Sequence, residues 1–228
     1  MNKLMSHVAV GAVLAGAATV AQAEVSGNVA LTTDYVWRGV SQSDSDPAIQ
    51  GGFDYAHESG FYAGVWGSNV DFDEAVADSA DLEFDIYAGF GGELGGGFGY
   101  DVSLIRYMYP GSEADLDWNE LNASVSYSIF SVGLAYSNDV FATDEDGIYY
   151  YGAVDWEFTP GYTLGAHVGQ YDFDTGTPDS YVDYGLGVST EYNGFGFDLS
   201  YYDTNDDGET LYGDWADGRV VLTVSKAL

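Results

Sequence analysis

The sequence has no cysteine, four prolines and only five lysine and arginine residues in 228. Without cysteine there is no disulfide framework, although an oxidising compartment stays possible. The few basic residues stand against 37 Asp and Glu, so the formal net charge is −32. Such a field repels nucleic acid and attracts cations. We therefore exclude nucleic acid as a partner and expect the chain to interact with cations.

Long apolar runs are also missing, apart from one near the start. A membrane helix needs about 20 consecutive apolar residues, so a membrane-spanning form of this chain must be a β-barrel. Residues 1–23 combine Lys3, an apolar run over residues 8–20 and the small-residue ending Ala21-Gln22-Ala23. This pattern predicts a secretory signal peptide cleaved before Glu24. The exported chain, residues 24–228, is predicted to be one domain.

Aromatic residues are abundant, with 20 Tyr, 12 Phe and 5 Trp. This excludes the disorder of acidic chains that have few aromatics, and it favours strands. Residues 81–90, DLEFDIYAGF, alternate apolar and acidic side chains. An extended strand places the two sets on opposite faces, so one face meets water and the other meets either a core or lipid.

The connections between the alternating segments indicate which of these holds. Tight turns such as Ser59-Gly60, Pro160-Gly161 and Asn193-Gly194 alternate with long polar segments. This alternation, with charges set opposite the apolar face, is typical of outer-membrane barrels. We predict an all-β fold, a transmembrane antiparallel up-and-down β-barrel of about 12 strands with short periplasmic turns and long extracellular loops. The first strand is expected at 25–38 and the last at 218–228. A secreted β-sandwich also alternates, but it does not explain the regular short and long connections.

Residues 32–72, TTDYVWRGVSQSDSDPAIQGGFDYAHESGFYAGVWGSNVDF, closely resemble the opening signature of the Gcw_chp group of proteobacterial proteins, also called the TorF-type porin family. Weaker similarity continues through Tyr109-Pro110-Gly111 and Glu120 to the last strand. The resemblance implies a Gram-negative outer-membrane barrel in contact with lipid and lipopolysaccharide. It implies no substrate and no mechanism.

A barrel of this size falls between packed eight-stranded and open sixteen-stranded barrels, which predicts a narrow aqueous pore. Acids in the lumen would make passive diffusion of small cations or polar solutes favourable. The alternative is a non-conducting surface barrel with a filled lumen, whose acidic loops bind divalent cations or a partner. The predicted lumen and selectivity residues are Asp34, Arg38, Asp54, Glu83, Asp85, Asp183, Asp198 and Arg219.

The arginines add two further predictions. Arg38 and Arg219 are expected on neighbouring strands, which would form a basic spot on one wall at the outer mouth. Opposite acids would then create a transverse field, but pairing of Arg38 with Asp34 as a structural strut is the favoured interpretation. Arg106 falls on the outward set and either extends to lipid phosphates or turns inward at a bulge.

The last long loop contains a possible metal site. Its pattern matches a calcium loop except that Asp replaces the final Glu, and the candidate ligands are Asp203, Asn205, Asp207, Glu209 and Asp214. A solvated acidic loop is the simpler interpretation. Apart from this possible calcium, we expect no cofactor.

The candidate catalytic groups are histidines. His57 and His167 are the only histidines after residue 23, and the sequence places neither a nucleophile nor an orienting acid beside them. The sequence therefore predicts a protein that is not an enzyme.

Overall fold

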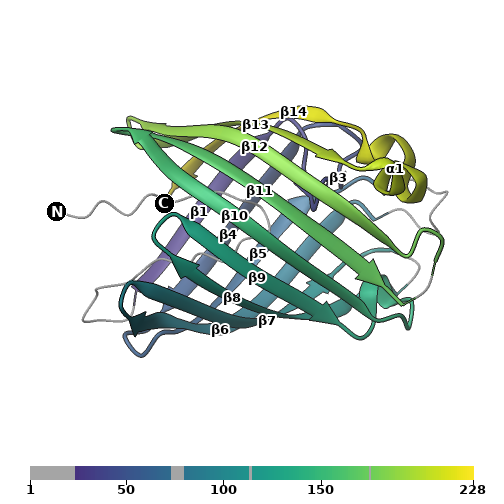
Figure 1. The fold of residues 1–228 in the computed structure, drawn as a ribbon, viewed down its shortest axis with the longest axis horizontal. Helices are drawn as coiled ribbons and strands as arrows, with labels where there is room; N and C mark the ends of the chain where they lie inside the picture. The colour runs from purple at the N-terminus through teal and green to yellow at the C-terminus, as the bar shows by residue number, and fades with distance from the viewer. Residues whose placement is uncertain (1–23, 73–79, 113–114, 175) are drawn as a thin grey trace.

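The computed structural model describes residues 24–72, 80–112, 115–174 and 176–228, so the predicted signal peptide lies outside the described residues. Twelve antiparallel strands form a closed barrel, in which β1 pairs with both β4 and β14 (Figure 1). The wall consists of β1 (Glu24–Thr32), β4 (Ala48–Ala56), β5 (Phe61–Asn69), β6 (Leu82–Gly95), β7 (Phe98–Met108), β8 (Trp118–Tyr127), β9 (Phe130–Ser137), β10 (Gly147–Thr159), β11 (Tyr162–Phe173), β12 (Ser180–Tyr192), β13 (Phe195–Thr204) and β14 (Arg219–Ala227). The predicted fold class is confirmed.

Short turns and long loops lie at opposite ends of the barrel, as the sequence predicts. We call these the turn end and the loop end. Asn193 and Gly194 join β12 to β13 with φ angles of 52° and 76°, the left-handed pair that favours a tight hairpin. The longer connections, including residues 33–47 and 205–218, all lie at the loop end.

The two faces of each wall strand differ in chemistry. In β6, Leu82, Ile86 and Phe90 lie on the outer surface with exposed fractions of 44%, 49% and 53%. Glu83 and Asp85 point to the interior and are buried. An apolar outer surface over a polar interior is the arrangement of a membrane-spanning barrel. The acids of residues 81–90 therefore face the lumen.

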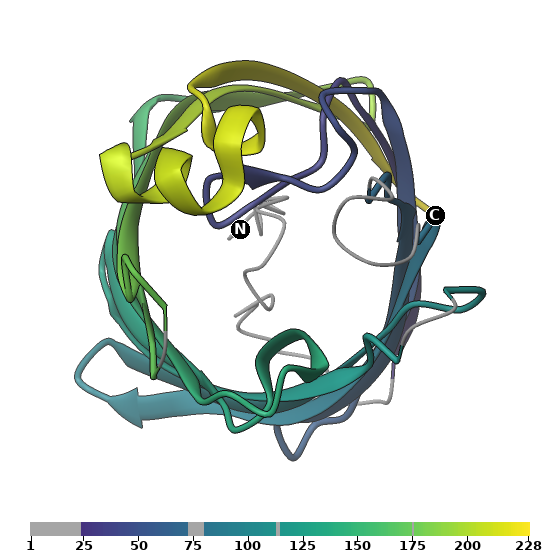
Figure 2. The same cartoon turned by 90° about the vertical axis from the view of Figure 1, so that its right-hand side faces the viewer.

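The first strand is shorter than the sequence predicts. It ends at Thr32 instead of residue 38, and the next residues form a small hairpin of β2 (Val36–Trp37) and β3 (Val40–Ser41). We call residues 33–47 the inner loop, because the loop folds inside the ring of strands (Figure 2). Arg38 and Gly39 turn the hairpin with φ angles of 49° and 81°. The consecutive side chains of Tyr35, Val36 and Trp37 are all buried, so this segment is a hairpin covered on both faces and not a wall strand.

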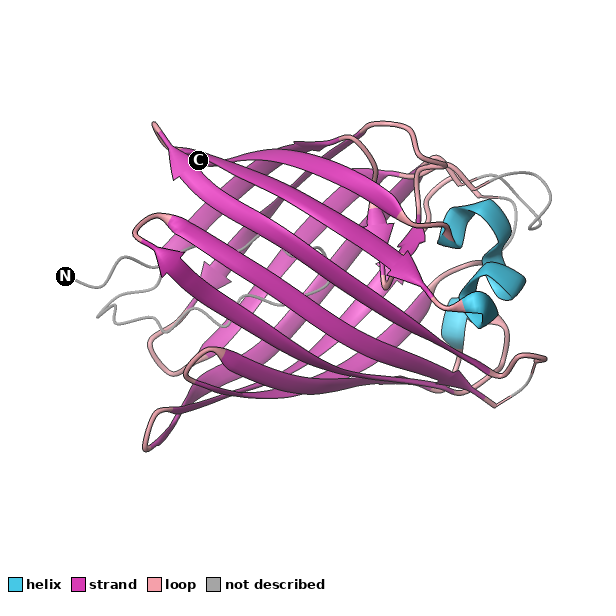
Figure 3. Cartoon of the chain, turned by 45° about the horizontal axis from the view of Figure 1, so that its top comes forward, coloured by secondary structure: helices cyan, strands magenta, loops and turns pink. Residues whose placement is uncertain are grey.

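The loop end also carries short helices, α1 (Asp206–Tyr212), η2 (Val140–Ala142) and η3 (Gly213–Ala216) (Figure 3). None of the helices in the described ranges is long and apolar enough to cross a membrane.

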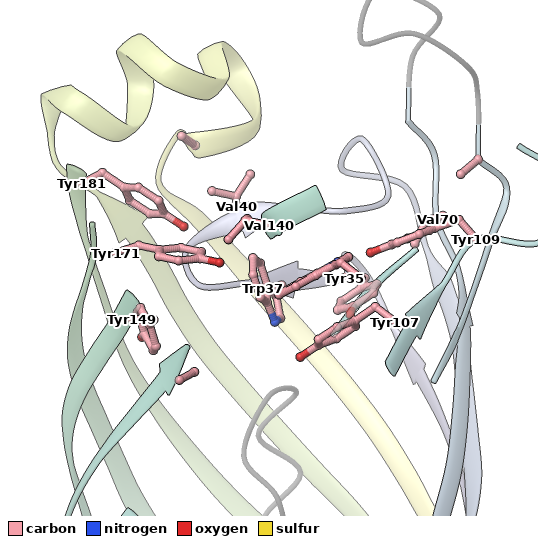
Figure 4. Packing of buried hydrophobic residues seen from close by; sticks show 14 of the residues in the cluster. Tyr35, Trp37, Val40, Val70, Tyr107, Tyr109, Val140, Tyr149, Tyr171 and Tyr181 are labelled. Carbon is pink, nitrogen blue, oxygen red and sulfur yellow. The ribbon is translucent and has the colours of Figure 1, made fainter. Parts of the chain in front are cut away.

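The buried aromatic residues gather inside the barrel near the loop end. Trp37 of the inner loop lies at the centre of this cluster, between Tyr171 on one side and Tyr107 on the other (Figure 4). Near the turn end, by contrast, the inward-facing Asp155 and Glu191 are exposed. The interior is therefore packed by the inner loop at the loop end and accessible to solvent toward the turn end.

Candidate functional site

Arg38, at the tip of the inner loop, lies in an aromatic cage. The carbon atom at the centre of its guanidinium group is 4.1 Å from the ring centre of Trp37, 4.2 Å from that of Tyr149 and 4.7 Å from that of Tyr171. Its Nη2 donates a hydrogen bond of 2.7 Å to Oε2 of Glu120. Only 9% of the Arg38 side chain is exposed. We call Glu120, Tyr149 and Tyr171 the wall cage, because they belong to β8, β10 and β11.

The contacts of Arg38 hold the hairpin across the lumen. The inner loop leaves the wall between β1 and β4, whereas Glu120, Tyr149 and Tyr171 lie on the opposite side of the strand order. The Tyr181 hydroxyl on β12 donates a hydrogen bond of 3.1 Å to the Arg38 carbonyl oxygen. The hairpin is therefore fixed at its tip by three adjacent strands and by β8.

The Arg38 side chain stays positively charged in this environment. Burial alone would lower its pKa, but the charge of Glu120 raises the pKa above its ordinary value. Arg38 therefore remains positive, and the pair with Glu120 is ionic. Trp37 adds edge-to-face contacts with Tyr107, Trp118 and Tyr171 at centroid separations of 6.3, 6.1 and 5.9 Å. Such contacts hold the hairpin in one defined position.

A second contact between the inner loop and the wall involves Glu83. Its two oxygens accept hydrogen bonds from the hydroxyls of Tyr35, at 2.8 Å, and Tyr109, at 3.3 Å. Burial, together with the charge of Glu83, raises the pKa of both phenols well above the usual range. They therefore stay protonated as donors. The neighbouring Asp85 has one buried oxygen, Oδ1, that has no hydrogen-bond partner among the described residues.

The predicted pairing of Arg38 with Asp34 is wrong. Asp34 instead binds Arg219 at 2.8 Å and accepts hydrogen bonds from Ser41 and Ser43. The prediction assumed that Arg38 lies four residues further along the same strand, but the chain leaves the wall after Thr32. Asp34 therefore does form a structural ion pair, but its partner is Arg219 and not Arg38.

The predicted basic spot on one wall is also wrong. Arg219 does begin β14 beside β1, as expected, but its Nη2 donates to the carbonyl oxygens of Asp214 and Trp215 at 2.8 and 2.6 Å. It joins the base of the inner loop to the last loop. Arg38 is held by β8, β10 and β11 instead, so the two arginines lie in separate environments.

The other predicted lumen acids face the interior and bind uncharged hydroxyl groups or histidine. Asp54 accepts a hydrogen bond from the Tyr87 hydroxyl, and Asp198 accepts one from Ser200 at 2.6 Å. Asp183 lies 2.7 Å from Nε2 of His167, an acid partner that the sequence did not reveal. These side chains come from separate strands and line the interior without forming one cluster.

Arg106 lies on the outward face of β7, which is one of the two predicted outcomes. No bulge turns it inward, because the pairing of β7 is regular at this position. Its Nη2 is 3.1 Å from Oδ2 of Asp117, and 41% of the side chain is exposed. Arg106 is therefore a surface residue with a local partner.

The five candidate calcium ligands do not form a calcium loop. Asn205 caps α1 by accepting a hydrogen bond from the Gly208 amide at 3.3 Å, and Asp203 accepts from Tyr184 and Tyr201. Among the described residues, no group of three or more His, Asp or Glu side chains could hold a metal ion. Acids in a first helical turn favour the helix dipole, so the pattern that resembled a metal loop begins a helix.

The sequence does not predict the wall cage. Glu120 belongs to the segment of weaker family similarity, and Tyr149 and Tyr171 have the pattern of ordinary strand aromatics. Their inward position follows from alternation, but their approach to Arg38 depends on where the inner loop ends. The sequence does contain one signal, the pair Arg38-Gly39. A pair that ends in glycine, between Trp37 and Val40, favours the tight turn of a hairpin.

The fold defines a porin-type barrel. A solved structure of the KdgM porin in complex with disordered oligogalacturonate is 10% identical, has a TM-score of 0.54, and the match covers 89% of this chain and 98% of that chain. A structure of the NanC porin is 8% identical with a TM-score of 0.57, over 88% of this chain and 98% of that chain. At these identities the likeness shows the fold alone.

The family follows from the sequence. The profile of the family described as "Bacterial protein of unknown function (Gcw_chp)" matches residues 16–228, so the chain belongs to this family. The resemblance in the opening segment is thus confirmed at the level of the family. A search of curated proteins gave no significant match.

Proposed function

We propose that this protein is an outer-membrane, porin-like channel for passive diffusion of small polar solutes and that it favours cations. The barrel has an apolar outer surface and a polar interior, and its fold is that of solved porins. Passive diffusion needs no catalytic residue, because the width of the lumen and the field inside it select the solute.

The observation that carries the cation preference is the pairing of the lumen acids. Within the described residues, arginine neutralises Asp34 and Glu120. Asp54 instead accepts a hydrogen bond from the Tyr87 hydroxyl, so no arginine is paired with it in the described part of the chain. Asp155 and Glu191 add negative charge at the accessible turn end. A lumen with this balance attracts cations and repels anions.

In this proposal the inner loop is the constriction. It crosses the lumen at the loop end, and the long acidic loops around the mouth concentrate cations before they enter. The charge of exposed loops acts over a Debye length of about 8 Å at physiological ionic strength. Added salt should therefore weaken the contribution of the loops before it weakens that of the lumen.

One observation favours the alternative of a non-conducting barrel. The inward side chains of the loop end are almost completely buried under the inner loop, including Trp118, Tyr171 and Glu83. A lumen sealed there would leave the acidic loops as the functional surface.

Single-channel recording separates the two functions. The refolded protein is placed in a planar bilayer under a potassium chloride gradient, beside a variant in which residues 36–41 are replaced by glycine and serine. Steps in the unaltered protein with a cation-directed reversal potential support the channel, and the variant should then conduct more. Current in the variant alone supports the non-conducting barrel. Silence of both folded proteins, or anion selectivity, contradicts the proposal.

A further inference from the structure

The site that holds Arg38 is formed mostly by the barrel wall. Glu120, Tyr149 and Tyr171 come from β8, β10 and β11, whereas only Trp37 and Arg38 itself belong to the inner loop. All three wall residues sit on paired strands. The wall cage would therefore keep its composition if the hairpin tip withdrew.

The chemistry of the wall cage is specific for organic cations. Two aromatic faces attract a cation through their negative centres, and the attraction is strongest where water is excluded. A carboxylate beside them pairs with a planar guanidinium or an ammonium group. Metal ions prefer a set of several oxygen ligands, and the described part of the chain brings no such set together.

The surrounding charge points to the same class of ligand. Glu83 and Asp85 lie buried on β6 and neither is paired with a basic side chain of the described residues. Asp183 is close to Tyr149 and His167. Asp155 and Glu191 line the accessible turn end, so an anion that approaches the wall cage from that end is repelled.

We propose that Glu120, Tyr149 and Tyr171 form a binding site for solutes that carry a guanidinium or primary amine group, and that Arg38 occupies this site as an internal ligand. This proposal rests on the proposed channel function and names its substrate class. A cationic solute competes with Arg38 and releases the tip of the hairpin. The base of the inner loop stays attached, because Asp34 and Arg219 hold it independently.

The test measures binding without requiring any current. The Arg38→Ala protein in detergent micelles is titrated with agmatine, an amine with a guanidinium group, while tryptophan fluorescence is recorded. Trp37 and Trp118 lie in contact in the same cluster and report its occupation. We expect the variant to bind agmatine at least about tenfold more tightly than the unaltered protein, because the internal competitor is gone.

Two controls make the result specific. Arg106→Ala removes an arginine with an acidic partner outside the lumen and should leave agmatine binding unchanged. Arg38→Ala combined with Glu120→Gln removes the carboxylate and should abolish the gain. Butylurea, which is neutral and of similar length, should not compete. If Arg38→Ala does not fold, Arg38→Gln is used, because it also removes the positive charge and can still donate a hydrogen bond.

Equal agmatine affinity in the folded variant and the unaltered protein would overturn the proposal, as would a gain that survives Glu120→Gln. This outcome is distinct from failure of the channel function, which is a lack of current in the bilayer. Tight binding by a barrel that carries no current would keep the wall cage and refute only transport.

Discussion

Nη2 of Arg38 lies 2.7 Å from Oε2 of Glu120, although 82 positions separate the two residues in the chain. One residue turns a two-stranded hairpin inside the barrel, and the other belongs to the wall that this hairpin faces. Because both side chains are almost completely buried, the contact fixes the inner loop across the lumen. Loss of this contact is thus the most direct way to move the inner loop.

Replacing Arg38 by Ala should destabilise the barrel. Removing one partner of a buried ion pair leaves the other charge uncompensated and costs about 3–5 kcal/mol. Urea unfolding of the reconstituted protein, followed by tryptophan fluorescence, measures this loss. The matched control is Arg106→Ala, whose exposed pair with Asp117 is worth about 0–1 kcal/mol. Similar losses for both variants would show that the Arg38 contact is not special.

Gly39→Ala should displace the tip of the hairpin from its contacts with the wall. Gly39 has a φ angle of 81°, and a Cβ atom added there would lie 2.7 Å from Cγ2 of Thr204 and 2.8 Å from Cβ of Asp183. Gly161, with a φ of 83° and nothing within 4 Å of an added Cβ, is the control with equal backbone strain of about 1–2 kcal/mol. Hydrogen exchange of the inner-loop amides should rise in Gly39→Ala only. Equal exchange in the two variants would contradict the tight packing of the tip.

Asp34→Asn should loosen the base of the inner loop and leave the tip in place. It weakens the ion pair with Arg219 and the hydrogen bonds from Ser41 and Ser43. We expect a cost of about 1–3 kcal/mol in the free energy of unfolding, because a partly buried charge pair is lost. The amide of Tyr35, which donates to Ser43, should exchange faster with solvent. An unchanged Tyr35 amide would mean that Asp34 does not organise the loop.

Asp54→Asn should reduce the cation preference that we propose for this protein. Asp54 faces the lumen, where it accepts a hydrogen bond from Tyr87. A unit charge near the path of an ion contributes about 1 kcal/mol in water, so the permeability ratio of potassium to chloride should fall by roughly twofold to fivefold. Asp206→Asn, an exposed acid on α1, is the control, and its effect should vanish in high salt. A ratio unaffected by Asp54→Asn would argue against selection by lumen acids.

Much of the fold was predictable because a barrel strand has a local signature. In residues 81–90 the period of two assigns each side chain to lipid or lumen, and Asn193-Gly194 marks a turn without any knowledge of the rest of the chain. The candidate site was only partly predictable. The inward position of Glu83, Asp85 and Asp183 followed from alternation, whereas the partners of Arg38 and Asp34 did not.

The residues whose structure the sequence predicts wrongly show why local patterns are not sufficient. Asp34 and Arg38 have the spacing of one face of a wall strand, and the same spacing occurs in a hairpin inside the barrel, where Tyr35, Val36 and Trp37 are all buried. Asp203, Asn205 and Asp207 have the spacing of a calcium loop, but Asp203 belongs to β13, Asn205 caps α1 and Asp207 lies in its first turn, where an acid favours the helix dipole. In both cases one local pattern serves two structures, and only the surrounding packing selects between them.

The sequence by itself determined the closed antiparallel barrel, the direction of each strand face and the acidic character of the interior, because these depend on periodicity and composition. Only the tertiary structure decided that the inner loop folds into the loop end of the lumen, that Arg38 contacts Glu120, Tyr149 and Tyr171, and that Arg219 pairs with Asp34. Those contacts join segments that closure of the barrel brings face to face, and no local pattern encodes the distance across a lumen.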